Sequence, residues 1–198
     1  MSDIVKEPNE SVTLLLNNWI IKDDKYSANQ LKSMVYYHLK GIVKNTIADK
    51  KHKSSSPSFI AQLPNTTSLL HDVLIQLTPP TEIMDNREQF YTSLALFVRW
   101  MLMDELKAKQ AQKRSHQKES ISQLLSLEDR SDPYFTFDEA FSQLKTLAPR
   151  CYKIALLHYY LGFKVSEMSD IIELKSAMIY NELATAKAYI RTQYPTFN

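Results

Sequence analysis

The sequence has few residues of two informative types. It contains only two glycines, Gly41 and Gly162, and one cysteine, Cys151. Phosphate-binding loops and dinucleotide fingerprints need several glycines at fixed spacing, so the sequence excludes both kinds of nucleotide site. One cysteine cannot form an internal disulfide, and the first segment, MSDIVKEPNE, lacks the basic-then-apolar order of a signal peptide. These features predict a cytoplasmic protein.

Long apolar runs and catalytic motifs are also missing. Charged or polar residues interrupt every hydrophobic stretch before it reaches the roughly 20 residues that cross a bilayer. The five histidines do not pair with Cys or Glu at zinc-ligand spacing, and the sequence has no nucleophile-elbow motif. Neighbouring carboxylates such as Asp23 and Asp24 diverge on a helix. We therefore expect no membrane contact, metal, cofactor, small-molecule substrate or catalytic residue, and we expect that the protein is not an enzyme.

Helical periodicity is present along most of the chain. Apolar residues recur every three or four positions, which is typical of helices with one buried face. The pattern predicts helices over 31–47, from Asn65 or Thr66 to before Pro79, from about Asn86 to Leu106, over 137–147 and over 150–161, and two short helices separated by a break at 173–175. Gly162 fits the left-handed position that ends a helix. The fold class is therefore all-α.

A polar stretch divides this all-α chain. Residues 108–135 are rich in Lys, Gln, Ser and acidic groups, which indicates a flexible linker between a domain of residues 1–107 and a domain of residues 136–198. The last two short helices have helix-turn-helix spacing, in which the first helix supports a second that can enter the DNA major groove. A simple helical hairpin has the same spacing, and periodicity alone leaves both interpretations open.

Four segments occur in the order of a known family. The first is SVTLLLNNWIIKDDKYSANQLKSMVYYHLKGIV. LPNTTSLLHDVLIQL and NREQFYTSLALFVRWMLMDELKAKQAQKR follow it, and the last is FDEAFSQLKTLAPRCYKIALLHYYLGFKVSEMSDIIELKSAMIYNELATAKAYIR, which includes an L-x-x-L-x-P-R segment. The ordered set resembles the bacterial extracytoplasmic-function (ECF) type of sigma factor, which directs RNA polymerase to promoters. The resemblance implies a region 2-like helical bundle at residues 1–107, which binds core polymerase and recognises and melts the minus-ten element. It implies a region 4-like helix-turn-helix, which reads the minus-thirty-five element, at residues 136–198.

The resemblance also implies site residues. Those that bind core polymerase would be His71, Asp72 and Gln76. Those that contact the minus-ten region would be Asn86, Arg87, Tyr91, Arg99, Lys107, Lys109, Lys113 and Arg114. In the helix-turn-helix, the DNA-binding residues would be Lys175, Ser176, Ala177, Tyr180, Asn181, Thr185, Lys187 and Arg191, with Asn181 able to read adenine bidentately. Core RNA polymerase, promoter DNA and an inhibitory anti-sigma factor are the implied partners.

The low positive charge of the chain leaves two alternatives to a functional sigma factor open. The chain has a net charge of +2, and residues 136–198 hold seven Lys and Arg against six Asp and Glu, hence a net charge of +1. The family commonly has a Pro and several Lys or Arg in the recognition helix, a basic residue in place of Trp100, and a capping serine in place of Lys164. One alternative is therefore a diverged sigma-like protein that binds polymerase but needs a partner for DNA targeting, or sequesters polymerase. Another is a stand-alone helix-turn-helix regulator.

Overall fold

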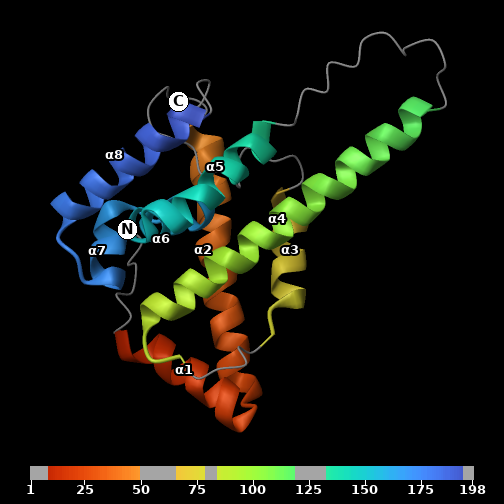
Figure 1. Cartoon of the computed structure of the whole chain (residues 1–198). Coiled ribbons are helices and arrows are strands. Elements are labelled where there is room, and N and C mark those ends of the chain that lie inside the picture. Colours follow the sequence, from red (N-terminus) through yellow and green to blue (C-terminus); the bar gives the residue numbers. More distant parts are fainter. Residues whose placement is uncertain (1–8, 50–65, 79–83, 119–132, 194–198) are drawn as a thin grey trace. The chain divides into compact units, whose positions relative to one another are not determined.

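The computed structural model describes residues 9–49, 66–78, 84–118 and 133–193, and every regular element in these ranges is an α-helix (Figure 1). The helices are α1 (Asn9–Lys22), α2 (Lys25–Asp49), α3 (Thr66–Gln76), α4 (Arg87–Lys118), α5 (Pro133–Leu147), α6 (Pro149–Leu161), α7 (Val165–Ile172) and α8 (Ser176–Gln193). The predicted all-α fold is confirmed for this part of the chain. None of these helices is long and apolar enough to span a membrane.

A tight turn joins α1 to α2. Asp23 adopts a left-handed backbone with φ of 49°, and the next residue, Asp24, caps α2. The Asp24 carboxylate accepts hydrogen bonds from the backbone N–H groups of Tyr26, at 3.2 Å, and Ser27, at 3.1 Å. It also accepts a bond of 2.5 Å from the Ser27 hydroxyl. These bonds hold the pKa of Asp24 below its usual range, those from Ser27 having the largest effect.

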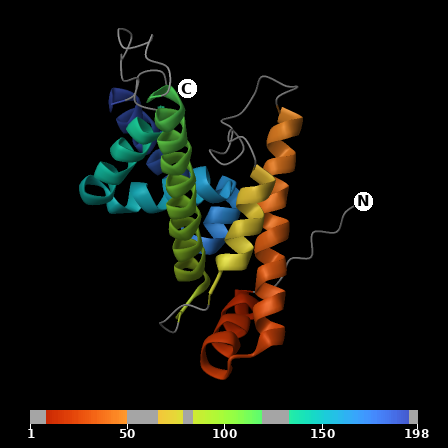
Figure 2. The same ribbon diagram turned by 90° about the vertical axis from the view of Figure 1, so that its right-hand side faces the viewer.

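The described residues form two compact units, and the boundary between them falls inside α4, after Leu96. The first unit contains α1, α2, α3 and the start of α4, together with Tyr159–Gly162. Within it, α1 packs against α2, and α3 lies along α2 (Figures 1 and 2). Its core consists mainly of aliphatic side chains, namely Val12, Leu16, Leu31, Val35, Leu39, Val73 and Leu94. The apolar faces predicted for α2, α3 and α4 therefore supply much of this core, and α1, which periodicity did not predict, adds Val12 and Leu16.

The second unit contains the rest of α4, most of α6, and α5, α7 and α8. Pro149 occupies the first position of α6, where its missing N–H is tolerated, and Ala148 separates α6 from α5. Gly162 follows α6 with φ of 67°, the left-handed conformation that the sequence predicted. The core of this unit is aromatic and aliphatic, with Phe137, Phe141, Leu144, Ile154, Leu157, Met168, Ile179 and Ile190 all buried.

Helix α4 extends further than its apolar pattern indicates. It continues to Lys118, so residues 108–118 of the expected linker are helical, and residues 119–132 lie outside the described part. Lys, Gln and Ala are strong helix formers, and they can continue a helix that has no buried face. The domain limits 1–107 and 136–198 remain a prediction.

Candidate nucleic-acid and polymerase interfaces

Helices α7 and α8 pack against each other and form the helix-turn-helix. Glu173, directly after α7, has a left-handed backbone with φ of 58°. The Ser169 hydroxyl donates a hydrogen bond of 2.6 Å to the carbonyl oxygen of Leu174, and the Met178 N–H donates one of 2.9 Å to the carbonyl oxygen of Lys175. These bonds define the turn at 173–175 that the sequence predicted.

The start of α7 keeps part of a capping arrangement although the usual serine is replaced. Lys164 has an extended backbone, and its ammonium group cannot accept a bond from the first turn. Its backbone N–H instead donates a hydrogen bond of 2.7 Å to the carboxylate of Glu167. The acidic side chain also suits the positive end of the helix dipole. Glu167 therefore compensates in part for the missing hydroxyl cap.

Helix α8 has one buried and one exposed face. Ile179, Ala186 and Ile190 are buried against the rest of the second unit. The opposite face carries exposed residues at helical spacing, namely Ala177, Tyr180, Asn181, Ala184, Thr185 and Ala188, followed by Arg191 in the last turn. We call the first six of these residues the α8 stripe. Among the other predicted DNA-binding residues of this module, Lys175, Ser176 and Arg191 are exposed and Lys187 is half-buried.

Glu182 points away from the α8 stripe and joins α8 to α6. Its carboxylate forms an ion pair with Arg150 and accepts a hydrogen bond of 2.5 Å from Arg150 Nε. The Cys151 thiol donates a second bond, of 2.6 Å, to the same carboxylate. The bond from Cys151 and the adjacent Arg150 hold the pKa of Glu182 below its usual range despite some desolvation. Conversely, burial and this carboxylate raise the pKa of the Cys151 thiol to about 11.

The outward face of α3 brings the predicted polymerase-binding residues together. His71, Asp72 and Gln76 are all exposed, whereas Val73 is fully buried. Ile75 lies on the same outward face and is 63% exposed. An exposed apolar residue beside polar and charged side chains is a common composition for a protein-binding surface.

The start of α4 carries the next predicted residues. Asn86 caps the helix, since its side-chain oxygen accepts a hydrogen bond of 2.9 Å from the Gln89 N–H. Arg87 and Tyr91 are half-buried, and the Tyr91 ring lies 5.1 Å from the ring of Phe90, centroid to centroid. Phe90 is buried, as the sequence predicted. The structure thus gives Asn86 a structural role that the prediction of a DNA contact did not include.

The side chains of only some of the predicted basic residues of α4 belong to the described part of the structure. Lys107 is exposed, whereas the side chains of Lys109, Lys113 and Arg114 lie outside the described residues. Trp100, which occupies a position that is commonly basic in the family, is 57% exposed and stacks near Phe97 with a centroid distance of 6.2 Å. Aromatic exposure therefore replaces positive charge at this point of α4.

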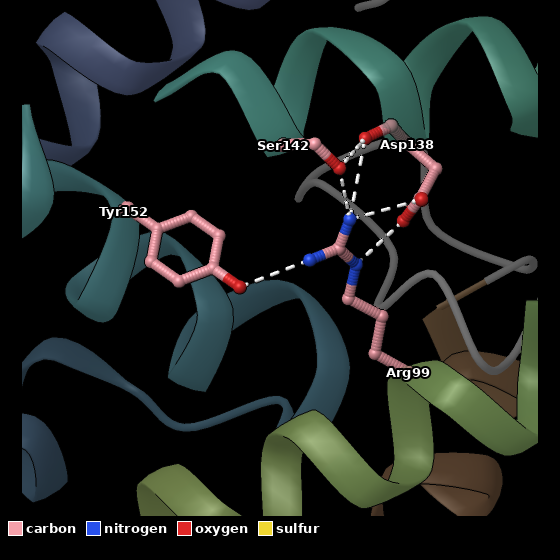
Figure 3. A network of polar contacts seen from close by, with 4 residues as sticks. All are labelled: Arg99, Asp138, Ser142 and Tyr152. Atoms are coloured by element: carbon pink, nitrogen blue, oxygen red, sulfur yellow. Dashed lines mark hydrogen bonds and ion pairs between the residues drawn. The ribbon is translucent and has the colours of Figure 1, made fainter. Parts of the chain in front are cut away.

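Arg99, the remaining predicted phosphate contact on α4, is the centre of a polar network in the second unit (Figure 3). Its Nε and Nη2 atoms donate to the two carboxylate oxygens of Asp138 at 2.6 and 2.9 Å, which is a bidentate ion pair. Nη1 donates to the Tyr152 hydroxyl at 2.9 Å, and Nη2 also donates to the Ser142 hydroxyl. The guanidinium carbon lies 5.3 Å from the centre of the Phe141 ring.

This network is well shielded from solvent. The Arg99 and Asp138 side chains are only 15% and 19% exposed. Burial raises the pKa of Tyr152, although the neighbouring Arg99 acts in the opposite direction. Because the guanidinium is bound from both sides, a DNA phosphate could reach Arg99 only after the ion pair with Asp138 opens. The predicted contact between Arg99 and DNA therefore stays a prediction and carries this condition.

Comparison with known proteins identifies the family. The family model for the ECF sigma factor matches residues 9–195, which is nearly the whole chain. The chain belongs to the ECF sigma factor family. Searches of the curated proteins and of the solved structures gave no match.

Membership of the ECF sigma factor family has two consequences. It assigns the chain a general role as an alternative sigma factor in transcription, and it accounts for a helix-turn-helix near the end of an all-α chain. Members of this family are regulators of transcription rather than enzymes. Among the described residues, no group of three or more His, Cys, Asp or Glu side chains could hold a metal ion.

Sequence reasoning missed three features of this ECF sigma factor. It did not include Ile75 in the outward face of α3, although Ile75 is out of phase with Val73 and directly precedes Gln76. It did not predict that the Glu182 side chain turns toward α6, where it is largely buried. It could not find the Arg99–Asp138 pair, because these residues are 39 positions apart and carry no shared motif.

Proposed function

We propose that this ECF sigma factor binds core RNA polymerase and directs it to promoters. In this proposal the outward face of α3 binds polymerase, α4 and residues 78–86 before it open the minus-ten element, and α7 and α8 read the minus-thirty-five element; of these, residues 79–83 lie outside the described part of the chain. The observation that carries the proposal is the helix-turn-helix itself, with its turn at Glu173 and its exposed α8 stripe, in a chain that the family model matches almost completely. We further propose that it acts in the cytoplasm, without a catalytic step.

Two features support a contact between α3 and polymerase. Asp72 is exposed, so its carboxylate is accessible to a basic partner. The neighbouring Ile75 can supply an apolar anchor, which charged contacts alone lack. A charge reversal at Asp72 should therefore weaken the complex while leaving the fold intact.

Size-exclusion chromatography with the cognate core RNA polymerase tests this step. We expect the wild-type chain to co-elute with core enzyme and Asp72→Arg to lose at least tenfold in affinity, which corresponds to about 1.4 kcal/mol. Glu139→Arg, a charge reversal at an exposed position of α5, is the matched control and should co-elute normally. A wild-type chain that does not bind cognate core enzyme would overturn the proposal and favour a free-standing DNA-binding regulator.

A second candidate function is favoured by the Arg99 network and by the low net charge of residues 136–198. In it, the chain binds polymerase but needs a partner for DNA targeting, or holds polymerase inactive. Besides core polymerase and promoter DNA, an anti-sigma factor is a third partner in this proposal. Run-off transcription with purified core enzyme separates the first two functions: a specific transcript supports the sigma function, and polymerase binding without a transcript supports the second.

A further inference from the structure

The α8 stripe has an unusual chemical composition for a DNA-reading surface. Its six residues comprise three alanines, one threonine, one asparagine and one tyrosine, and none of them is charged. They follow one another at spacings of three, one, three, one and three residues, so they form a continuous line along the helix. Each of the six is exposed, and Tyr180 is 63% exposed. A base edge facing this line would therefore meet methyl groups, one amide and one phenol.

The inward orientation of Glu182 is what keeps the stripe uncharged. Glu182 directly follows Asn181 in sequence, and an outward carboxylate there could accept a bond from cytosine or repel DNA phosphate. Its side chain is only 12% exposed and is bonded to Arg150 and Cys151 on α6. Arg150, which is 60% exposed, thus offsets the carboxylate charge beside the recognition helix.

The base pairs have different requirements in the major groove. Guanine is most often read by Arg or Lys, which donate to its O6 and N7 atoms, and cytosine by a carboxylate that accepts from its amino group. Adenine is read by Asn or Gln, which bonds its N6 and N7 atoms, and the thymine methyl group by Ala or by the methyl of Thr. The α8 stripe contains side chains that read adenine and thymine, namely Asn, Ala and Thr. It lacks the Arg, Lys and carboxylate side chains that read guanine and cytosine.

We propose that the α8 stripe reads A·T base pairs, with Asn181 bonding an adenine and the methyl groups of Ala177, Ala184 and Thr185 packing on thymines. This inference rests on the proposed function, because it assumes that α8 enters the major groove of the promoter. Recognition helices contact bases mainly with their N-terminal residues, which makes Ala177 and Asn181 the principal contacts. The Thr185 hydroxyl is bonded to the Asn181 carbonyl oxygen at 2.9 Å, so one rotamer of Thr185 is favoured.

The test is transcription from a promoter library by the holoenzyme of the full chain and cognate core enzyme. The upstream element is randomised, and transcripts are sequenced. We expect enrichment of A·T pairs, with adenine preferred at one position at least about fivefold through Asn181, which corresponds to about 1 kcal/mol. Asn181→Ala should abolish the adenine preference at that position alone, and Asn181→Arg should change it to guanine.

Controls separate this inference from the proposed function. Asn29→Ala removes the same amide from an exposed position of α2 and should leave the base preference unchanged. A holoenzyme that transcribes but selects G·C pairs at the positions facing α8, or an Asn181→Arg variant with the wild-type preference, would overturn the inference and leave the proposed function intact. Without transcription, the proposed function fails, and selection of randomised duplexes by the full chain at low ionic strength, where its few phosphate contacts bind most strongly, then decides the inference: no A·T enrichment there also overturns it.

Discussion

The ion pair between Arg99 and Asp138 offers a quantitative test of the second unit. Asp138→Asn removes the carboxylate charge and keeps the size of the side chain, and Arg99→Gln removes the guanidinium. Arg99→Gln removes the two bonds of 2.6 and 2.9 Å that join α4 to α5, whereas Asp138→Asn removes the charge and one of the two acceptor oxygens. In Asp138→Asn, Arg99 keeps its bond to Tyr152, so the loss should report mainly on the pair itself.

The structure sets the size of the expected effect. Exposed ion pairs contribute about 0–1 kcal/mol, whereas hydrogen bonds to charged groups in shielded places contribute about 1.5–3 kcal/mol. The two side chains are 15% and 19% exposed, which places the pair between these cases. We expect a coupling free energy of about 1–2 kcal/mol between the two substitutions in a double-mutant cycle.

Urea unfolding of the wild-type chain, the two single variants and the double variant, followed by far-ultraviolet circular dichroism, measures this coupling. The pair of Arg150 and Glu182 provides a matched comparison, because Arg150 is 60% exposed and its coupling should stay below about 1 kcal/mol. A coupling below about 0.5 kcal/mol for Arg99 and Asp138 would refute the reasoning. So would a larger coupling for the more exposed pair.

Two further predictions concern stability. Gly162→Ala should destabilise the chain by about 1 kcal/mol, because a Cβ atom is disfavoured at φ of 67°. Gly41→Ala, inside α2, should instead stabilise it. Urea unfolding compares the two variants, and equal changes in the free energy of unfolding would contradict the reasoning. The pKa of Cys151 is raised to about 11, so the folded chain keeps a proton that the unfolded chain loses, and stability should fall as the pH rises from about 8.5 toward that value. Cys151→Ala should show a weaker decline over this interval in denaturation midpoints, and an unchanged decline would contradict the assignment.

Much of the fold could be predicted because helices of this chain bury one regular face. The apolar positions Leu31, Val35 and Leu39 predicted α2, and the break after Gly162 and the turn at 173–175 followed from local backbone preferences. The end of α4 could not be predicted in the same way. Residues 108–118 have no apolar face, so periodicity gave no signal there, and only helix propensity indicated their structure.

The candidate sites were less predictable, because their chemistry depends on which side chains meet. Asp72 and Gln76 could be placed on the exposed face of α3 from helical phase alone. The partner of Arg99 lies on another helix, and nothing in the order of residues selects Asp138 among the other acidic side chains. Similarly, Glu182 lies next to Asn181 in sequence, and the bonds from Arg150 and Cys151 show that it faces α6.

These two pairings together reduce the charge available for DNA binding. Arg99 is bound to Asp138 and Arg150 to Glu182, so each basic side chain is offset by a nearby carboxylate. Affinity for DNA comes largely from phosphate contacts, and a module with a net charge of +1 has few of these to offer. Base contacts from an uncharged stripe can discriminate between sequences, but they add little affinity without those contacts. We therefore expect recognition by α8 at physiological ionic strength to depend on core polymerase, which would hold residues 136–198 near DNA at a high effective concentration and so replace the missing electrostatic attraction.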